Sequence, residues 1–135
     1  MLEAAENPHS HRVPAARDEV IARSKLAEID QVGTTRARQV MDAACSEEDF
    51  QATVVAYAHL RGWMVYHPWS SKHSESGYPD LTMTRHGRLV FAELKTQKGR
   101  VSREQAVWLN ALEGTGARCF LWRPGDWPAV EEELL

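Results

Sequence analysis

Cysteine is scarce in this chain, and long apolar runs are missing. The 135 residues include two cysteines, Cys45 and Cys119, which are too few for a disulfide framework or a cysteine-based zinc site. No apolar run approaches the roughly 20 residues that cross a bilayer. Residues 1–20 also lack the basic-then-apolar order of a secretory signal. We therefore expect a cytoplasmic protein that has no membrane partner.

An overall excess of positive charge is also absent. The net charge of −3 argues against a protein that coats nucleic acid non-specifically. The charge is uneven, however, because residues 61–103 carry eight basic residues and three acids, a local balance of 8 − 3 = +5. Such a field around a few acids fits a site that holds a phosphate backbone, and a solvated face with scattered lysines would explain it equally well.

The chain divides into two zones, an N-terminal extension of residues 1–45 and a compact domain of residues 46–135. Residues 1–15 are polar, contain two prolines and are predicted to be mobile. Apolar residues recur at loosely helical spacing over residues 16–44. Gly33-Thr34 interrupts that spacing, which predicts two short helices.

The compact domain predicts an α/β fold in the order helix, three strands, helix, strand, helix. Three polar residues are candidate N-caps of its helices, namely Ser46, Ser102 and Asp126. Short apolar runs between turn residues predict four strands, at Trp63–His67, Leu81–Arg85, Arg88–Leu94 and Ala117–Trp122.

The second and third strands place two acids in an unfavourable position. If His86-Gly87 forms a two-residue hairpin loop, Arg85 faces Arg88 and Asp80 faces Glu93. Like charges that face each other across strands are destabilising, unless they share a proton or a cation. Two carboxylates suit a hard divalent ion such as magnesium. Lys95 follows Glu93 on the same strand face, where its ammonium could orient a water or offset charge on a phosphate.

These residues resemble a known nuclease signature. Pro79-Asp80 and, twelve residues later, Glu93-Leu94-Lys95 are similar to the PD-(D/E)xK motif, and the order of elements is that superfamily's core order. Further segments resemble the small stand-alone VRR-NUC proteins of phages and bacteria: SEEDFQ, GYPDL, FAELK, Ser102 with Gln105, and WRPGDW. The resemblance covers residues 46–135, and it implies a restriction-endonuclease-like fold.

The resemblance also implies roles for individual residues. Asp80, Glu93 and the carbonyl of Leu94 would bind Mg²⁺ or Mn²⁺, and Lys95 would position water. An acid of the first helix commonly completes the family's site. Glu47 suits this role better than Glu48, although acids in a first helical turn are usually only partners of the helix dipole.

Other residues are candidates for contact with substrate. Gln105 matches a family position at the site, but it would also be an ordinary glutamine on a helix surface. Basic residues flank the presumed site and are expected to meet phosphates, namely Lys72, Lys98, Arg100 and Arg103. His67 is either a further contact or a structural histidine.

The function implied by the resemblance is a Mg²⁺- or Mn²⁺-dependent endodeoxyribonuclease. It would be a homodimer that prefers branched DNA, such as Holliday junctions or flaps, and would act in the host cytoplasm if a phage encodes it. No recognition helix rich in Arg, Asn and Gln is visible, so readout of a base sequence is not indicated. The alternatives are a non-cleaving nucleic-acid-binding or assembly module on a nuclease fold, and a restriction-type enzyme with sequence specificity.

Overall fold

The computed structural model describes residues 35–68 and 71–135. The chain divides into two compact units, Met1–Val40 and Met41–Leu135. Residues 35–44 are helical, whereas most of the predicted N-terminal extension lies outside the described residues. No helix in the described part of the chain is both long enough and apolar enough to cross a membrane.

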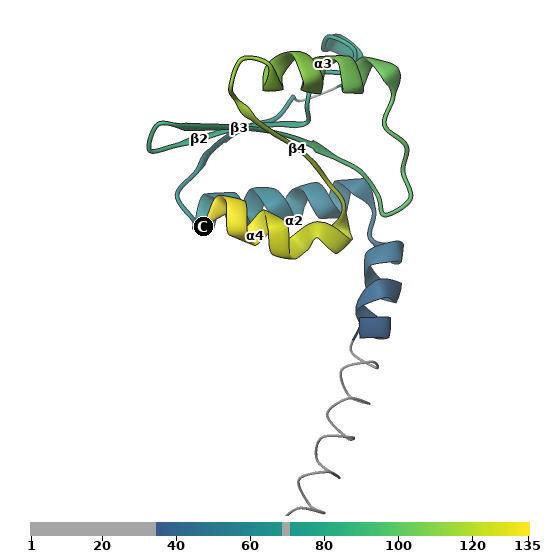
Figure 1. Cartoon of the computed structure of the whole chain (residues 1–135). Coiled ribbons are helices and arrows are strands. Elements are labelled where there is room, and N and C mark those ends of the chain that lie inside the picture. The colour runs from purple at the N-terminus through teal and green to yellow at the C-terminus, as the bar shows by residue number, and fades with distance from the viewer. Residues whose placement is uncertain (1–34, 69–70) are drawn as a thin grey trace, which may run out of the picture. The chain divides into compact units, whose positions relative to one another are not determined.

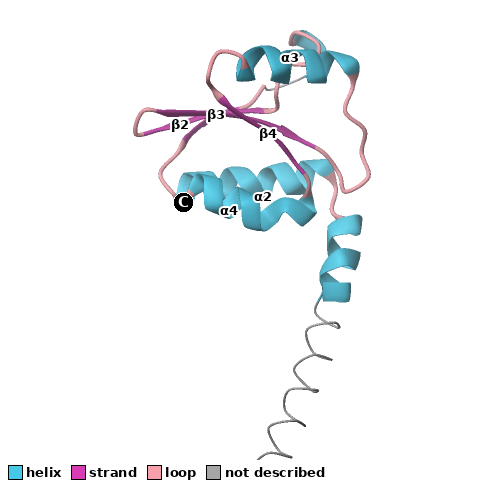
Figure 2. Cartoon of the chain, viewed as in Figure 1, coloured by secondary structure: helices cyan, strands magenta, loops and turns pink. Residues whose placement is uncertain are grey.

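The second unit is a four-stranded mixed sheet between helices, in the strand order β1-β2-β3-β4. The first three strands pair antiparallel, and β4 joins β3 in parallel. Figure 1 shows α3 on one face of the sheet and both α2 and α4 on the other, and Figure 2 separates helices from strands by colour. The elements in chain order are α2 (Glu47–Leu60), β1 (Met64–Tyr66), the short helix η1 (Ser71–His73), β2 (Leu81–Arg85), β3 (Arg88–Leu94), α3 (Arg103–Glu113), β4 (Arg118–Trp122), η2 (Pro124–Asp126) and α4 (Trp127–Leu134).

This order confirms the predicted α/β class and the predicted sequence of helix, three strands, helix, strand and helix. The second and third strands have the predicted bounds, whereas β1 and β4 are shorter than predicted. The Ser46 side chain accepts a hydrogen bond from the Asp49 amide (3.0 Å), and Gly62 follows α2 with φ +85°, as a helix end requires.

The prediction for Asp126 was only partly right. Asp126 precedes α4 at the N-cap position, but its side chain does not cap that helix. Its Oδ2 instead accepts a hydrogen bond from the Arg123 amide (2.9 Å). The carboxylate therefore stabilises the preceding 3₁₀ turn.

The β2–β3 hairpin has the predicted register. Arg85 pairs with Arg88, and the pairs continue to Leu81 and Ala92. His86 and Gly87 both have positive φ (49° and 76°), as a two-residue loop with the twist of the strands requires. One more step along the ladder brings Asp80 opposite Glu93.

The hydrophobic core lies between the sheet and the helices α2 and α4. Alternate strand residues point into it from β2, β3 and β4, and they meet apolar side chains of both helices. The core residues are Phe50, Val54, Ala58, Trp63, Leu81, Met83, Val90, Ala92, Leu94, Trp122, Val130 and Leu134. Since Leu81 and Ala92 point into this core, Asp80 and Glu93 must emerge on the opposite face, the one that α3 covers.

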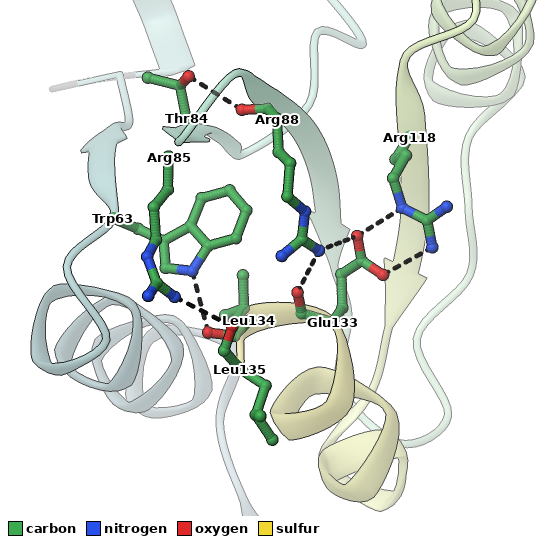
Figure 3. Close-up of polar contacts among 8 residues, drawn as sticks. All are labelled: Trp63, Thr84, Arg85, Arg88, Arg118, Glu133, Leu134 and Leu135. Carbon is green, nitrogen blue, oxygen red and sulfur yellow. Dashed lines mark hydrogen bonds and ion pairs between the residues drawn. The ribbon is translucent and has the colours of Figure 1, made fainter.

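A polar cluster fastens α4 to the sheet, and Figure 3 shows it. Glu133 accepts two hydrogen bonds from Arg118, to Oε1 (2.6 Å) and Oε2 (2.7 Å), and one from Arg88 to Oε1 (3.0 Å). Arg88 also donates to the Glu133 carbonyl (2.6 Å), and Trp63 Nε1 donates to the Leu134 carbonyl (3.0 Å). Contacts from β3, β4 and the residue before β1 thus converge on the last turn of one helix.

The electrostatics of Glu133 follow from this cluster. Burial raises the pKa of Glu133, but the hydrogen bonds and charges of Arg118 and then Arg88 outweigh burial, so its pKa is lowered overall. A lowered pKa means that the ionised group stabilises the fold above its ordinary pKa of 4.5, and that this stabilisation is lost as the pH falls through the folded-state value.

We expect Glu133→Gln to lower the free energy of unfolding at pH 7 by about 1–3 kcal/mol, the usual range for hydrogen bonds to a charged group. Urea denaturation measures this loss, and Glu132→Gln on the exposed side of α4 is the matched control, which should change stability by less than about 0.5 kcal/mol. The difference between wild type and Glu133→Gln should shrink as the pH falls below 4.5. Equal stability of the two glutamine variants at pH 7 would contradict this role.

Candidate active site

A polar cleft of about 410 Å³ opens where the N-terminus of α2, the loop before β2 and the N-terminus of α3 meet. Asp80 lies on its wall, together with one acid and one amide from α2 and one amide from α3. Its lining residues are Glu47, Gln51, Pro68, Ser74, Glu75, Ser76, Gly77, Tyr78, Asp80 and Gln105.

Asp80 is fixed at the end of the hairpin by the neighbouring strand. Its Oδ2 accepts a hydrogen bond from the Leu94 amide (2.8 Å), and Pro79 before it is buried. This hydrogen bond leaves the other carboxylate oxygen, Oδ1, unconstrained. Asp80 is therefore held in a defined orientation while part of it still faces the cleft.

Glu93 is the unusual residue of the site, because its side chain is only 1% exposed. Its Oε1 accepts a hydrogen bond from Gln105 Nε2 (2.8 Å), whereas its Oε2 is buried and has no hydrogen-bond partner among residues 35–68 and 71–135. Burial, followed by the negative charge of Asp80, raises the pKa of Glu93 to about 8, although Lys95 acts in the opposite direction. The pair would therefore hold a proton near neutral pH unless a cation replaces it.

Lys95 lies beside Glu93, as the strand alternation predicted. Its Nζ is 3.9 Å from Glu93 Oε1, and its side chain is only 13% exposed. The Lys95 amide donates to the Trp122 carbonyl (3.0 Å), which ties the end of β3 to the end of β4. The structure thus brings Asp80, Glu93 and Lys95 together on one face.

Gln105 owes its orientation to the cap of α3. Its Oε1 accepts from the Ser102 amide (2.8 Å), while its own amide donates to Ser102 Oγ (3.1 Å), so the two residues form a reciprocal capping box. With Oε1 used by Ser102, the NH₂ group is left to face Glu93. A glutamine at this position therefore serves the helix end and the acidic pair at once.

Gly77 allows the loop before β2 to approach α3 closely. It has φ +88°, and a Cβ on it would lie 2.5 Å from the carbonyl carbon of Glu104. Only glycine fits here without moving α3. Tyr78 continues this contact, because its ring meets Phe91 and Trp108 edge to face, with centroids 6.2 and 5.2 Å away.

Of the two candidate acids on α2, the structure brings Glu47 to the site. Glu47 lines the cleft, and its charge contributes to the raised pKa of Glu93. Glu48 does not line the cleft. Metal binding by Glu47 remains a prediction.

The residues predicted to contact substrate lie in different parts of the domain. Arg103 begins α3, and Lys98 and Arg100 lie in the loop before it; all three are exposed, and none forms an ion pair within the described part of the chain. Lys72 is exposed in η1. His67 is exposed after the end of β1 and does not line the cleft, so the structure does not bring it to the acids.

The residues present fit a divalent cation at the acidic pair. Glu93 Oε2 has no hydrogen-bond partner among the described residues, and the pKa of the carboxyl is raised. A cation beside the pair would give this oxygen a ligand and would favour the ionised form. Within residues 35–68 and 71–135, no three His, Cys, Asp or Glu side chains come together closely enough to hold a metal by themselves. A cation at Asp80 and Glu93 would therefore need further oxygens, such as the Leu94 carbonyl, water or a phosphate.

Sequence reasoning missed several residues around the site. Gly77 and Tyr78 were read only as parts of a motif, although both pack the loop against other elements. Arg123 was likewise included only as part of the WRPGDW segment, and Gln97 was not considered, although both make hydrogen bonds in the turn that follows Lys95. Their partners lie more than 20 residues away, so no local pattern could have indicated them.

Comparisons with known proteins gave one structural likeness. No family model matches the chain, and no curated protein matches it. A solved structure described as a VRR_NUC domain is 22% identical, with a TM-score of 0.49; the match covers 57% of this chain and 84% of that chain. The case for Asp80 and Glu93 rests on the contacts described above.

We expect Asp80→Asn to stabilise the metal-free protein at alkaline pH, by about 0.2–1 kcal/mol, the range for a pair of facing charges. Asparagine keeps an oxygen for the Leu94 amide and removes the charge. Because the pKa of Glu93 is raised, its contribution to stability is complete below 4.5 and is lost as the pH rises through about 8.

Urea denaturation in EDTA at pH 5 and pH 9 measures the effect. Loss of stability between these values should be smaller in Asp80→Asn than in the wild type, with Glu113→Gln at the exposed end of α3 as control. An asparagine variant as pH-sensitive as the wild type would show that the two carboxyls do not repel each other.

Proposed function

We propose that this protein is a divalent-metal-dependent endodeoxyribonuclease that acts in the cytoplasm. The observation that carries the proposal is the buried Glu93 carboxyl, which has a partnerless oxygen, faces Asp80 and lies beside Lys95. A binding module gains nothing from this costly arrangement, because facing carboxylates weaken a sheet and attract no phosphate. The arrangement becomes useful when a cation and a phosphate occupy the site together.

The residues that would hold Mg²⁺ or Mn²⁺ are Asp80, Glu93 and the Leu94 carbonyl, with Glu47 acting directly or through water. Such an ion, when bound, polarises the phosphate and lowers the pKa of a water. In hydrolysis, the water oxygen would form a bond to phosphorus and lose a proton to solvent, while the bond from phosphorus to one sugar oxygen breaks and that oxygen takes up a proton from solvent and leaves as a hydroxyl.

The chain's own residues would orient this reaction. Lys95 is held within 3.9 Å of Glu93, so its ammonium can donate a hydrogen bond to the attacking water or to a phosphate oxygen. Gln105 fixes Glu93 through the 2.8 Å hydrogen bond and thereby fixes the direction in which Glu93 Oε2 points. Asp80 is fixed in the same way by the Leu94 amide.

Three exposed cations that follow Glu93 and Lys95 in the chain support DNA as the substrate. Lys98, Arg100 and Arg103 lie in or next to the loop between β3 and α3, are exposed, and have no ion-pair partner within the described residues. Free cations near an acidic pair would bind phosphates on either side of the bond to be cut. Lys72 and His67 are further, weaker candidates for such contact. Contacts of this kind position DNA without reading its sequence.

The test of the chemistry is cleavage of DNA with and without Mg²⁺. We expect Asp80→Ala and Glu93→Ala to abolish cleavage, and Lys95→Ala to lower its rate by about 10²–10³, as loss of a group that stabilises transition-state charge does. Circular dichroism should show that each variant is folded. Undiminished cleavage in excess EDTA, or full activity of Asp80→Ala, would rule out the mechanism.

Glu47→Gln and Glu48→Gln form a matched pair within the same test. Glu47→Gln should weaken metal affinity, so that the rate reaches half its maximum at a higher Mg²⁺ concentration, whereas Glu48→Gln should behave as wild type. The opposite ranking would assign the role to Glu48, and no effect from either would leave both as partners of the helix dipole.

The preferred substrate is proposed to be branched DNA, such as a four-way junction or a flap, bound by a homodimer. One compact domain offers one acidic pair, and a symmetric cut of two strands needs two such sites related by a two-fold axis. The resemblance to stand-alone VRR-NUC proteins supports this preference, and the exposed cations are compatible with it.

Linear duplex, flap and four-way-junction substrates should be compared, with light scattering on the same preparation. We expect a dimer that cuts branched DNA faster than duplex and whose binding weakens steeply with salt. A monomer that cuts duplex at one defined sequence as fast as any junction would favour a restriction-type enzyme. Tight junction binding without cleavage under any metal would favour a non-cleaving module.

A further inference from the structure

The segment that follows Lys95 is held by one arginine from the far end of the domain. Residues 96–99, here called the Lys95 turn, leave β3 directly after the lysine. Arg123 Nη1 donates to the carbonyls of Thr96 (2.8 Å) and Gly99 (2.6 Å), with a longer contact to the Gln97 carbonyl (3.4 Å). One guanidinium nitrogen therefore gathers three main-chain oxygens of the same short turn.

A second set of bonds holds the same turn. The Gly125 amide donates to Gln97 Oε1 (2.9 Å), and a Cβ on Gly125 would lie 2.9 Å from Gln97 Nε2. The Arg123 main chain is itself fixed, because its amide donates to Asp126 Oδ2 (2.9 Å). The residues after β4 therefore hold the Lys95 turn in two ways. The Arg123 side chain donates to carbonyls of the turn, and the Gln97 side chain accepts from the Gly125 amide.

The Lys95 turn in turn contacts the lysine side chain. A Cβ built on Gly99 would lie 3.5 Å from Lys95 Cδ, so Gly99 lies next to the aliphatic part of the lysine. The same Gly99 supplies the carbonyl that Arg123 binds at 2.6 Å. A continuous path of contacts thus runs from Arg123 through Gly99 to Lys95, whose ammonium is 3.9 Å from Glu93.

We infer that Arg123 is a positioning residue for the active site, and that it holds the Lys95 ammonium where the reaction needs it. The inference rests on the proposed nuclease function. Arg123 touches no reacting group; it acts through the Lys95 turn. Removal of its donors would take this partner from the Gln97 and Gly99 carbonyls, leave the Thr96 carbonyl with only the Gly99 amide (3.2 Å), and free the turn to move. A displacement of about 1 Å at a catalytic group can lower a rate by about 10²-fold.

The first experiment measures kcat and KM of DNA cleavage for Arg123→Met, which keeps a side chain of similar length without donors. We expect kcat to fall by about 10–100-fold with KM within about threefold of wild type, because misplacement of Lys95 affects the reaction more than binding. Arg123→Lys should recover part of kcat, since an ammonium can also donate to carbonyls. Arg61→Met, at an exposed arginine after α2, is the matched control and should match the wild type.

The second experiment measures amide hydrogen exchange in the metal-free protein and does not depend on activity. In Arg123→Met, amides of residues 95–100 should exchange faster, while amides of β2 and α2 should retain wild-type protection. Unchanged exchange at residues 95–100 would show that Arg123 does not hold the Lys95 turn. Faster exchange with unchanged kcat would overturn the positioning role.

Gly125→Ala tests the same hold from the other side and leaves Arg123 intact. Its methyl group would press on the Gln97 side chain, so exchange at residues 95–100 should increase and kcat should fall, by less than in Arg123→Met. If the wild type cleaves no DNA with any metal, the proposed function is wrong, and so is the part of this inference that concerns catalysis. The exchange data then still decide whether Arg123 holds the turn. A Gly125→Ala variant with wild-type exchange and kcat would contradict the inference.

Discussion

The register of the β2–β3 hairpin is the constraint on which the rest of the structure depends. Pairing of Arg85 with Arg88 sends Leu81, Val90 and Ala92 into the core. The same register leaves Asp80 and Glu93 side by side on the opposite face. A slip of one residue would bring these carboxylates to the apolar side of the sheet, where no cation or donor could reach them. Packing of the hydrophobic core therefore holds the two carboxylates close together, although their repulsion destabilises the strand pair.

The surroundings of the pair make this repulsion tolerable. The Leu94 amide and the Gln105 amide group each donate to one acid, and Lys95 supplies a nearby positive charge. These three contacts fix the acids without neutralising them completely, since one oxygen of Glu93 stays without a partner. The polar cluster around Glu133 lies on the other face, where its acid is matched by two arginines. The Glu133 carboxylate is thus paired on both oxygens, whereas the Glu93 carboxylate keeps one oxygen without a partner among the described residues.

The features that local sequence signals encode were predictable, and those that depend on distant partners were not. The hairpin bounds and the cap of α2 follow from neighbouring residues, so the sequence was sufficient to place Asp80 opposite Glu93 and Ser46 before its helix. The Arg123 contacts span 24 to 27 residues, and those of Arg88 with Glu133 span 45. Asp126 shows that a local signal can also be insufficient. Its position before α4 was predicted from the sequence, but its side chain accepts from the Arg123 amide and does not cap that helix.

The shared use of Gln105 links helix fraying to the integrity of the acidic site. The hydrogen bonds that close the first turn of α3 are made by the same side chain that orients Glu93. First turns of helices open more often than the core of a domain, on a much faster timescale than global unfolding. Each such opening would release Glu93 from its donor while the sheet stays folded. Warming would therefore loosen the acidic pair before the protein melts, and Glu93 would regain its donor as soon as one helical turn had closed.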